Sequence, residues 1–123
     1  MCKLKTSEIL GERHNLDIIM FLDMFGSRSR GEIYRAISMS SGMARKLETL
    51  STHGIVELYE YEGSRRKMVK LTSLGKEFAS ALGNLELRSG GDLEKYRAEA
   101  ALDINSGPDK LLSPEEGPTI VRR

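Results

Sequence analysis

The segment SRGEIYRAISMSSGMARKLETLSTHGIVELYEYEGSRRKMVKLTSLGKEF, residues 29–78, decides the fold, because the spacing of its hydrophobic residues changes along its length. Apolar residues first recur every three or four positions, interrupted by a polar break, and this predicts two short helices. They then alternate, which predicts two strands joined by a turn around Gly63. A helical spacing resumes after Thr72. The predicted elements are helices at residues 29–37 and 41–53, strands at 55–61 and 67–72, and a further helix that continues through Leu85.

Hydrophobic residues occupy nearly every face of residues 15–25, and a helix with that pattern is buried. We therefore expect a central core helix that Asn15 caps and Gly26 ends. Shorter helices are expected at residues 6–13 and 93–102. All three prolines lie near the C-terminal end, and this composition predicts a flexible tail. The chain is thus divided into a main domain (residues 1–88), a short helix with a role in dimerisation (89–103) and a tail (104–123).

The composition is that of one small domain. The 123 residues are 39% hydrophobic and 30% charged, with few aromatic residues, so the core must be mainly aliphatic. The longest apolar run, residues 18–22, is far shorter than the roughly 20 residues that span a bilayer. A single cysteine, Cys2, excludes an internal disulfide and favours a reducing compartment. We therefore expect a cytoplasmic protein without a membrane span.

The small net charge of +1 hides an uneven distribution. Residues 26–76 contain ten basic and five acidic residues, whereas residues 89–123 contain seven acidic and five basic ones. A basic middle segment favours a polyanionic partner, such as nucleic acid, for that part of the chain. The alternative interpretation is an ordinary scatter of charges over a solvated surface.

Four local motifs follow one another in residues 29–78. They are the helix pair SRGEIYRAISMSSGMARKLETL, the helix exit THGIVELY, the basic hairpin tip GSRRK and the helix entry VKLTSLGKEF. In this order they resemble the winged helix-turn-helix of prokaryotic transcription regulators, particularly the MarR-like and HxlR-like groups. The resemblance implies an α+β, mostly helical fold, with a three-helix core, a two-stranded β-hairpin wing and one or more C-terminal helices. The Asp-x-Arg wing signature and the usual Trp are absent, so no subfamily is assigned.

The helix predicted at residues 41–53 has the chemistry that major-groove recognition needs. Small or hydroxylic residues at its start let the backbone approach the DNA, and long cations follow them. Basic side chains at the hairpin tip and at the start of the preceding helix can contact the backbone or the minor groove. Exposed positions without a partner are the alternative. The predicted DNA-binding residues are Arg28, Arg30, Ser40, Ser41, Gly42, Arg45, Lys46, Thr49, Arg65, Arg66 and Lys67.

Nothing in the sequence favours catalysis. His14, His53 and Cys2 lack the spacing of a zinc site, and there is no glycine-rich phosphate loop. His53 is better explained as a residue that favours the C-terminal end of a helix. We therefore expect no enzyme activity, cofactor or metal.

The last helix of the main domain has a hydrophobic stripe that is longer than the domain itself needs. This stripe either packs back on the core or pairs with a second copy, and the resemblance favours a homodimer on palindromic DNA. Its residues are Leu74, Phe78, Leu82 and Leu85. Together these features predict a sequence-specific regulator that binds double-stranded DNA. A winged-helix module that binds proteins within a larger assembly is the alternative, and a small-molecule effector is left open.

Overall fold

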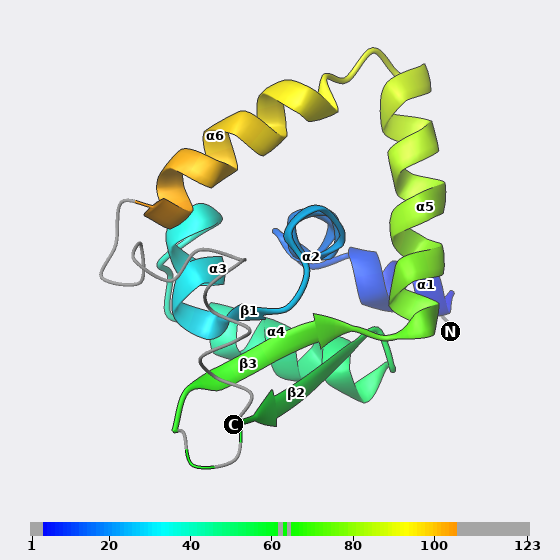
Figure 1. Ribbon diagram of the computed structural model, residues 1–123. Helices are drawn as coiled ribbons and strands as arrows, with labels where there is room; N and C mark the ends of the chain where they lie inside the picture. Colours follow the sequence, from blue (N-terminus) through cyan, green and yellow to red (C-terminus); the bar gives the residue numbers. More distant parts are fainter. Residues whose placement is uncertain (1–3, 62, 64, 106–123) are drawn as a thin grey trace.

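Six helices and three short strands make up the part of the chain that the computed structural model describes, residues 4–61, 63 and 65–105. Figure 1 shows α2 in the centre, the sheet on one side of it, and α5 and α6 on the others. The chain is therefore α+β and mostly helical, as predicted. The helices are α1 (Lys5–Leu10), α2 (Asn15–Phe25), α3 (Arg30–Ala36), α4 (Met43–Thr52), α5 (Ser73–Arg88) and α6 (Leu93–Asn105), and the strands are β1 (Arg28–Ser29), β2 (Val56–Glu60) and β3 (Lys67–Leu71).

The sheet is antiparallel with the strand order β1-β3-β2. The predicted hairpin is confirmed as β2 and β3, whose register pairs Val56 with Leu71 and Glu60 with Lys67. The third strand, β1, was not predicted, because two residues are too short to show an alternating pattern. It pairs with the edge of β3 that faces away from β2, so the sheet ties the hairpin to the segment between α2 and α3.

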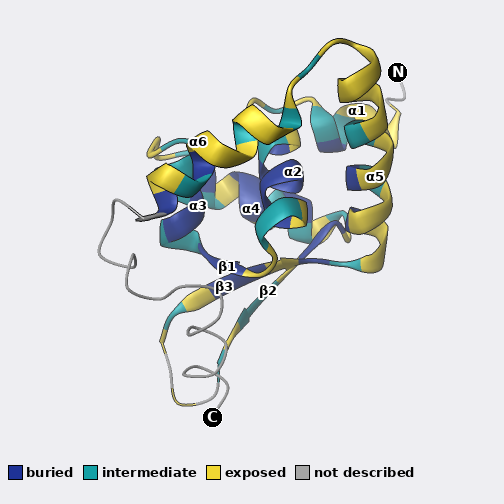
Figure 2. Cartoon of the chain, turned by 45° about the horizontal axis from the view of Figure 1, so that its top comes forward, coloured by how far each residue is buried: buried dark blue, intermediate teal, exposed yellow. Residues whose placement is uncertain are grey.

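The core surrounds α2, as its all-round hydrophobicity predicted. Ile18, Ile19 and Phe21 are fully buried and pack with Leu47 of α4 and Val69 of β3. Figure 2 shows buried residues gathered in α2 and on the inner sides of α3, α4 and the sheet, whereas the outer sides of α5 and α6 are exposed. The helix pair and the hairpin therefore share one core.

The start of α2 differs from the prediction. His14 occupies the N-cap position in a left-handed conformation (φ 77°), and its side chain makes no capping hydrogen bond. Asn15, expected as the cap, is instead fully buried, and its Nδ2 donates a hydrogen bond to the Ile9 carbonyl oxygen at 2.6 Å. Asn15 thus ties α1, which ends at Leu10 rather than at residue 13, to the central helix.

The two C-terminal helices cover α2 from opposite sides (Figure 1). Thr72 caps α5, because its hydroxyl accepts a hydrogen bond from the Gly75 N–H at 3.0 Å. After α5, α6 crosses back and packs against α3. It extends to Asn105, so residues 104 and 105 belong to a helix and not to the predicted tail. The rest of that prediction, residues 106–123, lies outside the described residues.

The predicted hydrophobic stripe on α5 packs on the core in part and is exposed in part. Phe78 and Leu82 pack against the core, whereas Leu74 and Leu85 are 43% and 57% exposed. Only the middle of the stripe therefore serves the domain itself. None of the helices in the described part of the chain has the length and hydrophobicity needed to cross a membrane.

Candidate nucleic-acid interface

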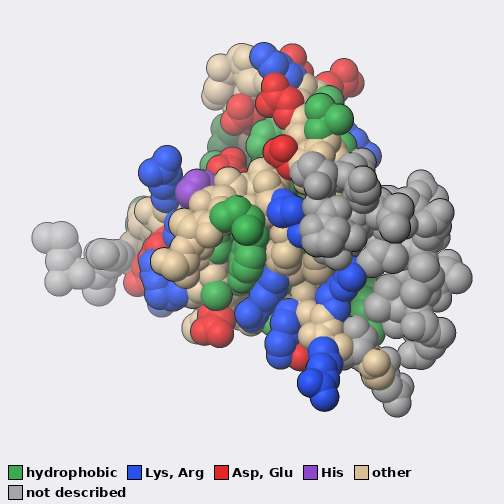
Figure 3. All heavy atoms as spheres, turned by 90° about the vertical axis from the view of Figure 1, so that its left-hand side faces the viewer, with side chains coloured by type: hydrophobic (Ala, Val, Ile, Leu, Met, Phe, Trp, Pro, Cys, Tyr) green, Lys and Arg blue, Asp and Glu red, His purple; other side chains and the backbone are tan. Residues whose placement is uncertain are grey.

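Most of the predicted DNA-binding residues belong to α3, the α3–α4 link, α4 and the β2–β3 hairpin. Figure 3 shows Lys and Arg side chains gathered on the lower part of the face that lies to the left in Figure 1, where α3 and the hairpin are found. The fold therefore collects cations from segments that are separated along the chain. The individual side chains differ greatly in their exposure and partners.

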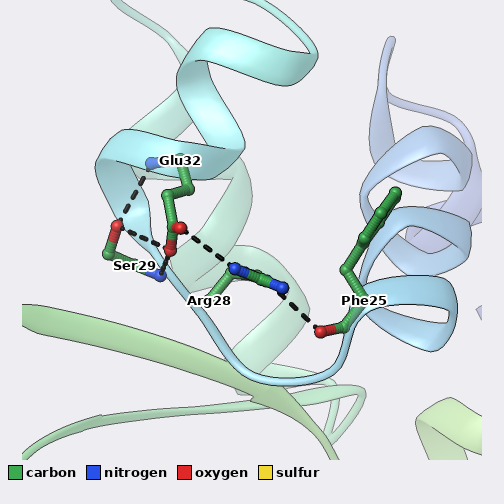
Figure 4. A network of polar contacts seen from close by, with 4 residues as sticks. All are labelled: Phe25, Arg28, Ser29 and Glu32. Atoms are coloured by element: carbon green, nitrogen blue, oxygen red, sulfur yellow. Dashed lines mark hydrogen bonds and ion pairs between the residues drawn. The ribbon is translucent and has the colours of Figure 1, made fainter. Parts of the chain in front are cut away.

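Arg28 is not part of this surface, which corrects the prediction that it contacts phosphate. Its side chain is 6% exposed and lies between α2 and α3 (Figure 4). Its Nη1 donates a hydrogen bond to Glu32 Oε2 at 3.1 Å, and its Nε donates to the Phe25 carbonyl oxygen at 3.2 Å. The guanidinium thus holds the end of α2 to the start of α3.

The same contacts fix where α3 begins. Glu32 Oε1 accepts hydrogen bonds from the Ser29 N–H at 3.0 Å and from the Ser29 hydroxyl at 3.2 Å, and Ser29 Oγ accepts one from the Glu32 N–H at 3.2 Å. This reciprocal arrangement is a capping box. Because one Glu32 oxygen serves the cap and the other serves Arg28, a single buried carboxylate sets the position of α3 (Figure 4).

The prediction that Lys46 contacts DNA is also wrong. It is 8% exposed and lies on the packed side of α4 with Met43 and Leu50. Four residues advance a helix by only about 40° around its axis, so Lys46 is a neighbour of Leu50 and not its opposite. The Lys46 ammonium instead lies 3.4 Å from Nδ1 of His14. It holds the α1–α2 loop against α4 and is not available to a ligand at the surface.

Arg45 projects from the outer side of α4, as predicted, and its side chain is 62% exposed. Its guanidinium is nevertheless engaged, because Nη1 and Nη2 donate to the two oxygens of the Glu12 carboxylate at 2.9 and 3.0 Å. The hydrogen bond from Arg45 lowers the pKa of Glu12, and the bond with Glu12 raises that of Arg45. Arg45 thus reaches the surface as half of an ion pair.

The small and hydroxylic residues predicted to contact DNA lie in α4 or just before it. Ser40 and Ser41 are exposed, and Gly42 and Thr49 are half-buried. α4 begins at Met43, however, so these serines form the turn before the helix and not its first turn. The turn is closed by a hydrogen bond from the Met43 N–H to the Ser40 carbonyl oxygen at 3.3 Å.

His53 occupies the C-cap position of α4, as the sequence suggested. Its Nδ1 donates to the Thr49 carbonyl oxygen at 3.0 Å, and its Nε2 lies 3.3 Å from Oε1 of Glu8 in α1. The hydrogen bond to the Thr49 carbonyl, together with the Glu8 carboxylate, raises the pKa of His53. The positively charged form therefore stabilises both the end of α4 and its contact with α1.

The hairpin carries exposed cations beside α3. Arg65 and Lys67 are exposed and Arg66 is half-buried, while Lys67 forms an ion pair with Glu60, its partner across the hairpin. Arg30 begins α3, and its half-buried side chain lines a hollow with Glu60 and Lys67. The structure thus brings Arg30 to the hairpin, and this explains how the start of α3 contributes to the same face.

Two features of this face were not found from the sequence. Lys70 on β3 is exposed, and its Nζ lies 3.7 Å from Glu57 Oε1 and faces the ring of Tyr59. Its position in the basic hairpin could have indicated that it belongs to the candidate site. The Glu12 carboxylate beside Arg45 had no such signal, because 33 residues separate the two. Within the described residues, no group of His, Cys, Asp and Glu side chains is arranged to hold a metal ion.

The comparisons with known proteins add no relative: no family model matches the chain, and neither a curated protein nor a solved structure is similar enough to match it.

Proposed function

We propose that this chain binds double-stranded DNA as a winged-helix transcription regulator, with α4 in the major groove and the β2–β3 hairpin on the backbone or minor groove. The observation that carries the proposal is the arrangement of elements. A short strand, two helices and a hairpin follow in that order, the sheet order is β1-β3-β2, and Arg45 of α4 and Arg65 and Lys67 of the hairpin are exposed.

The dimensions of α4 suit this role. Its ten residues make a helix about 15 Å long, and the major groove is about 12 Å wide. Ser40 and Ser41 place no bulky side chain before the helix, so the backbone can approach the DNA closely. Arg45 has the forked donors that recognise a guanine edge or a phosphate. α4 therefore combines close approach with one strong cationic contact.

The proposed contact set is smaller than the predicted one, because Arg28 and Lys46 are buried. On α4 and the turn before it, the set keeps the small and hydroxylic positions and one arginine. On α3 and the hairpin, it keeps the cations suited to backbone contact, which carry no sequence information themselves. The set is Arg30, Ser40, Ser41, Gly42, Arg45, Thr49, Arg65, Arg66 and Lys67.

Selection of preferred duplexes from a random pool tests this proposal. The purified chain is expected to enrich a defined motif, and Arg45→Ala to weaken binding to it. Arg88→Ala is the matched control, because Arg88 is exposed at the end of α5, far from α4 and the hairpin (Figure 1). Enrichment of no motif, or equal losses in the two variants, would contradict the proposal.

The exposed part of the α5 stripe supports a second proposal, that the chain associates through this helix. Leu74 and Leu85 of this stripe, which are eleven residues apart on the same side of the helix, are 43% and 57% exposed. Burial of such residues is the usual driving force for association. A symmetric dimer would present two copies of α4 to a palindromic site. If the chain binds no DNA, the same leucines favour the alternative of a module that binds another protein.

A further inference from the structure

We infer that Glu12 acts as an internal competitor for the phosphate that Arg45 would bind, so that the segment before α2 restrains DNA binding. This inference rests on the proposed function. It concerns residues 4–14, to which the sequence assigned no role at the interface. In chemical terms, a DNA phosphate replaces the Glu12 carboxylate on the Arg45 guanidinium.

Three contacts join this segment to α4, two near the beginning of the helix and one at its end. Glu12 binds Arg45 near the beginning of α4, His14 lies against Lys46, and Glu8 reaches His53 at the other end. α1 and the loop that follows it are therefore fixed along α4 and not at one point only. Glu12 is thereby held beside the helix that the proposed function places in the groove.

The Glu12–Arg45 pair differs from the ion pairs of the hairpin. Glu60 with Lys67 and Glu57 with Lys70 are direct cross-strand neighbours in the β2–β3 register, so sheet geometry alone accounts for them. No secondary-structure register places Glu12 opposite Arg45. The contact exists because the loop before α2 crosses α4 at this point.

The geometry of the pair matches what a phosphate would offer. Both carboxylate oxygens accept from the two terminal nitrogens of Arg45, and arginine uses the same bidentate fork for phosphate. The pair is also accessible, since the Arg45 side chain is 62% exposed and that of Glu12 is 33% exposed. DNA can therefore reach Arg45, but it meets a guanidinium whose charge is already neutralised and a carboxylate that repels phosphate.

Removing the competing charge is expected to tighten binding. With Glu12→Gln, Arg45 becomes available to phosphate, and the gain in affinity is expected to be about two- to fivefold, the range of an exposed ion pair. The slope of log K against log salt is expected to stay close to that of wild type, because Arg45 neutralises the same phosphate in both complexes once DNA has displaced Glu12.

The experiment measures the binding of wild type, Glu12→Gln and Glu48→Gln to one selected duplex over a series of salt concentrations. Glu48 is the matched control, because it is an exposed carboxylate on α4 itself, three residues from Arg45. Its removal changes the net charge equally but leaves the Glu12–Arg45 pair intact. The comparison is repeated in an Arg45→Ala background, where the effect of Glu12→Gln is expected to disappear.

Two results would overturn the inference while leaving the proposed function in place. One is a Glu12→Gln affinity equal to or lower than that of wild type. A lower affinity would mean that Glu12 positions Arg45 for DNA. The other is a gain that persists without Arg45, which would mean a general charge effect. Failure of all the variants to bind DNA at low salt would instead overturn the proposed function, and the inference with it.

Discussion

Substitution of Glu32 by alanine tests how the helix pair is held in place. The carboxylate accepts hydrogen bonds from the Ser29 N–H and hydroxyl and from Arg28, and all three residues are buried (Figure 4). Its removal leaves the Arg28 charge with the Phe25 carbonyl oxygen and leaves the Ser29 N–H without its acceptor. Breaking a buried ion pair on one side costs about 3–5 kcal/mol.

That loss is large against the stability of a domain of this size, which is typically about 5–15 kcal/mol. We expect the free energy of unfolding of Glu32→Ala to fall by about 3–5 kcal/mol, and its melting temperature to fall by on the order of 20 °C. Denaturant titration followed by far-ultraviolet circular dichroism measures the first quantity, with an unchanged slope showing that the two-state comparison is valid.

A double variant separates the unpaired charge from the lost cap. Arg28→Met with Glu32→Gln removes both charges, keeps similar volumes and retains an amide oxygen for the cap, so it is expected to recover most of the stability. Ser29→Ala, which removes only the cap hydroxyl, is expected to cost about 1 kcal/mol. The explanation is wrong if Glu32→Ala costs less than Ser29→Ala, or if the double variant is as unstable as Glu32→Ala.

Three further predictions concern other parts of the fold. His53→Gln is expected to destabilise the chain more at pH 6 than at pH 8.5 in denaturant titrations. The pKa of His53 is raised in the folded chain, so its stabilisation is complete below the ordinary pKa of 6.5 and is lost as the pH rises through the folded pKa. An equal loss of stability at both pH values would contradict this. Gly75→Ala is expected to lower the free energy of unfolding by about 1–3 kcal/mol, because its Cβ would overlap the Ile55 carbonyl oxygen. Gly83→Ala on the same helix, whose Cβ would lie 3.6 Å from Met20 Cε, is expected to be neutral or to stabilise the fold by up to about 1 kcal/mol. Calorimetry that ranks the two variants the other way would refute the packing of α5. Leu85→Glu is expected to convert a dimer to a monomer in sedimentation velocity, and a dimer that persists would place the interface elsewhere.

The regular elements could be predicted because their hydrophobic residues repeat. The all-round hydrophobicity of α2, the stripe of α5 and the alternation of β2 and β3 each predicted an element close to its observed bounds. Two features had no such repeat. β1 has only two residues and is a strand solely because β3 lies beside it. The N-cap of α2 is His14 in a left-handed conformation, whereas cap chemistry favoured Asn15.

The surface of the candidate site was harder to predict than its framework. Arg45, Ser40 and Ser41 were expected to be exposed, and the structure exposes them. Arg28 was misplaced because its partner, Glu32, was considered only as a charge, although a spacing of four residues allows a direct ion pair. Contacts between segments far apart in sequence, such as Glu12 with Arg45, depend on the complete fold and leave no local pattern.

The salt dependence of DNA binding tests the central claim most directly. For a selected duplex, log K is expected to fall linearly with log salt, with a slope of roughly −3 to −5 if about four or five cations of α3, α4 and the hairpin reach phosphates. Arg45→Ala is expected to make the slope shallower by about one, and Arg88→Ala to leave it unchanged. No binding at low salt, or equal slopes for wild type and Arg45→Ala, would contradict the proposal that α4 contacts DNA through Arg45.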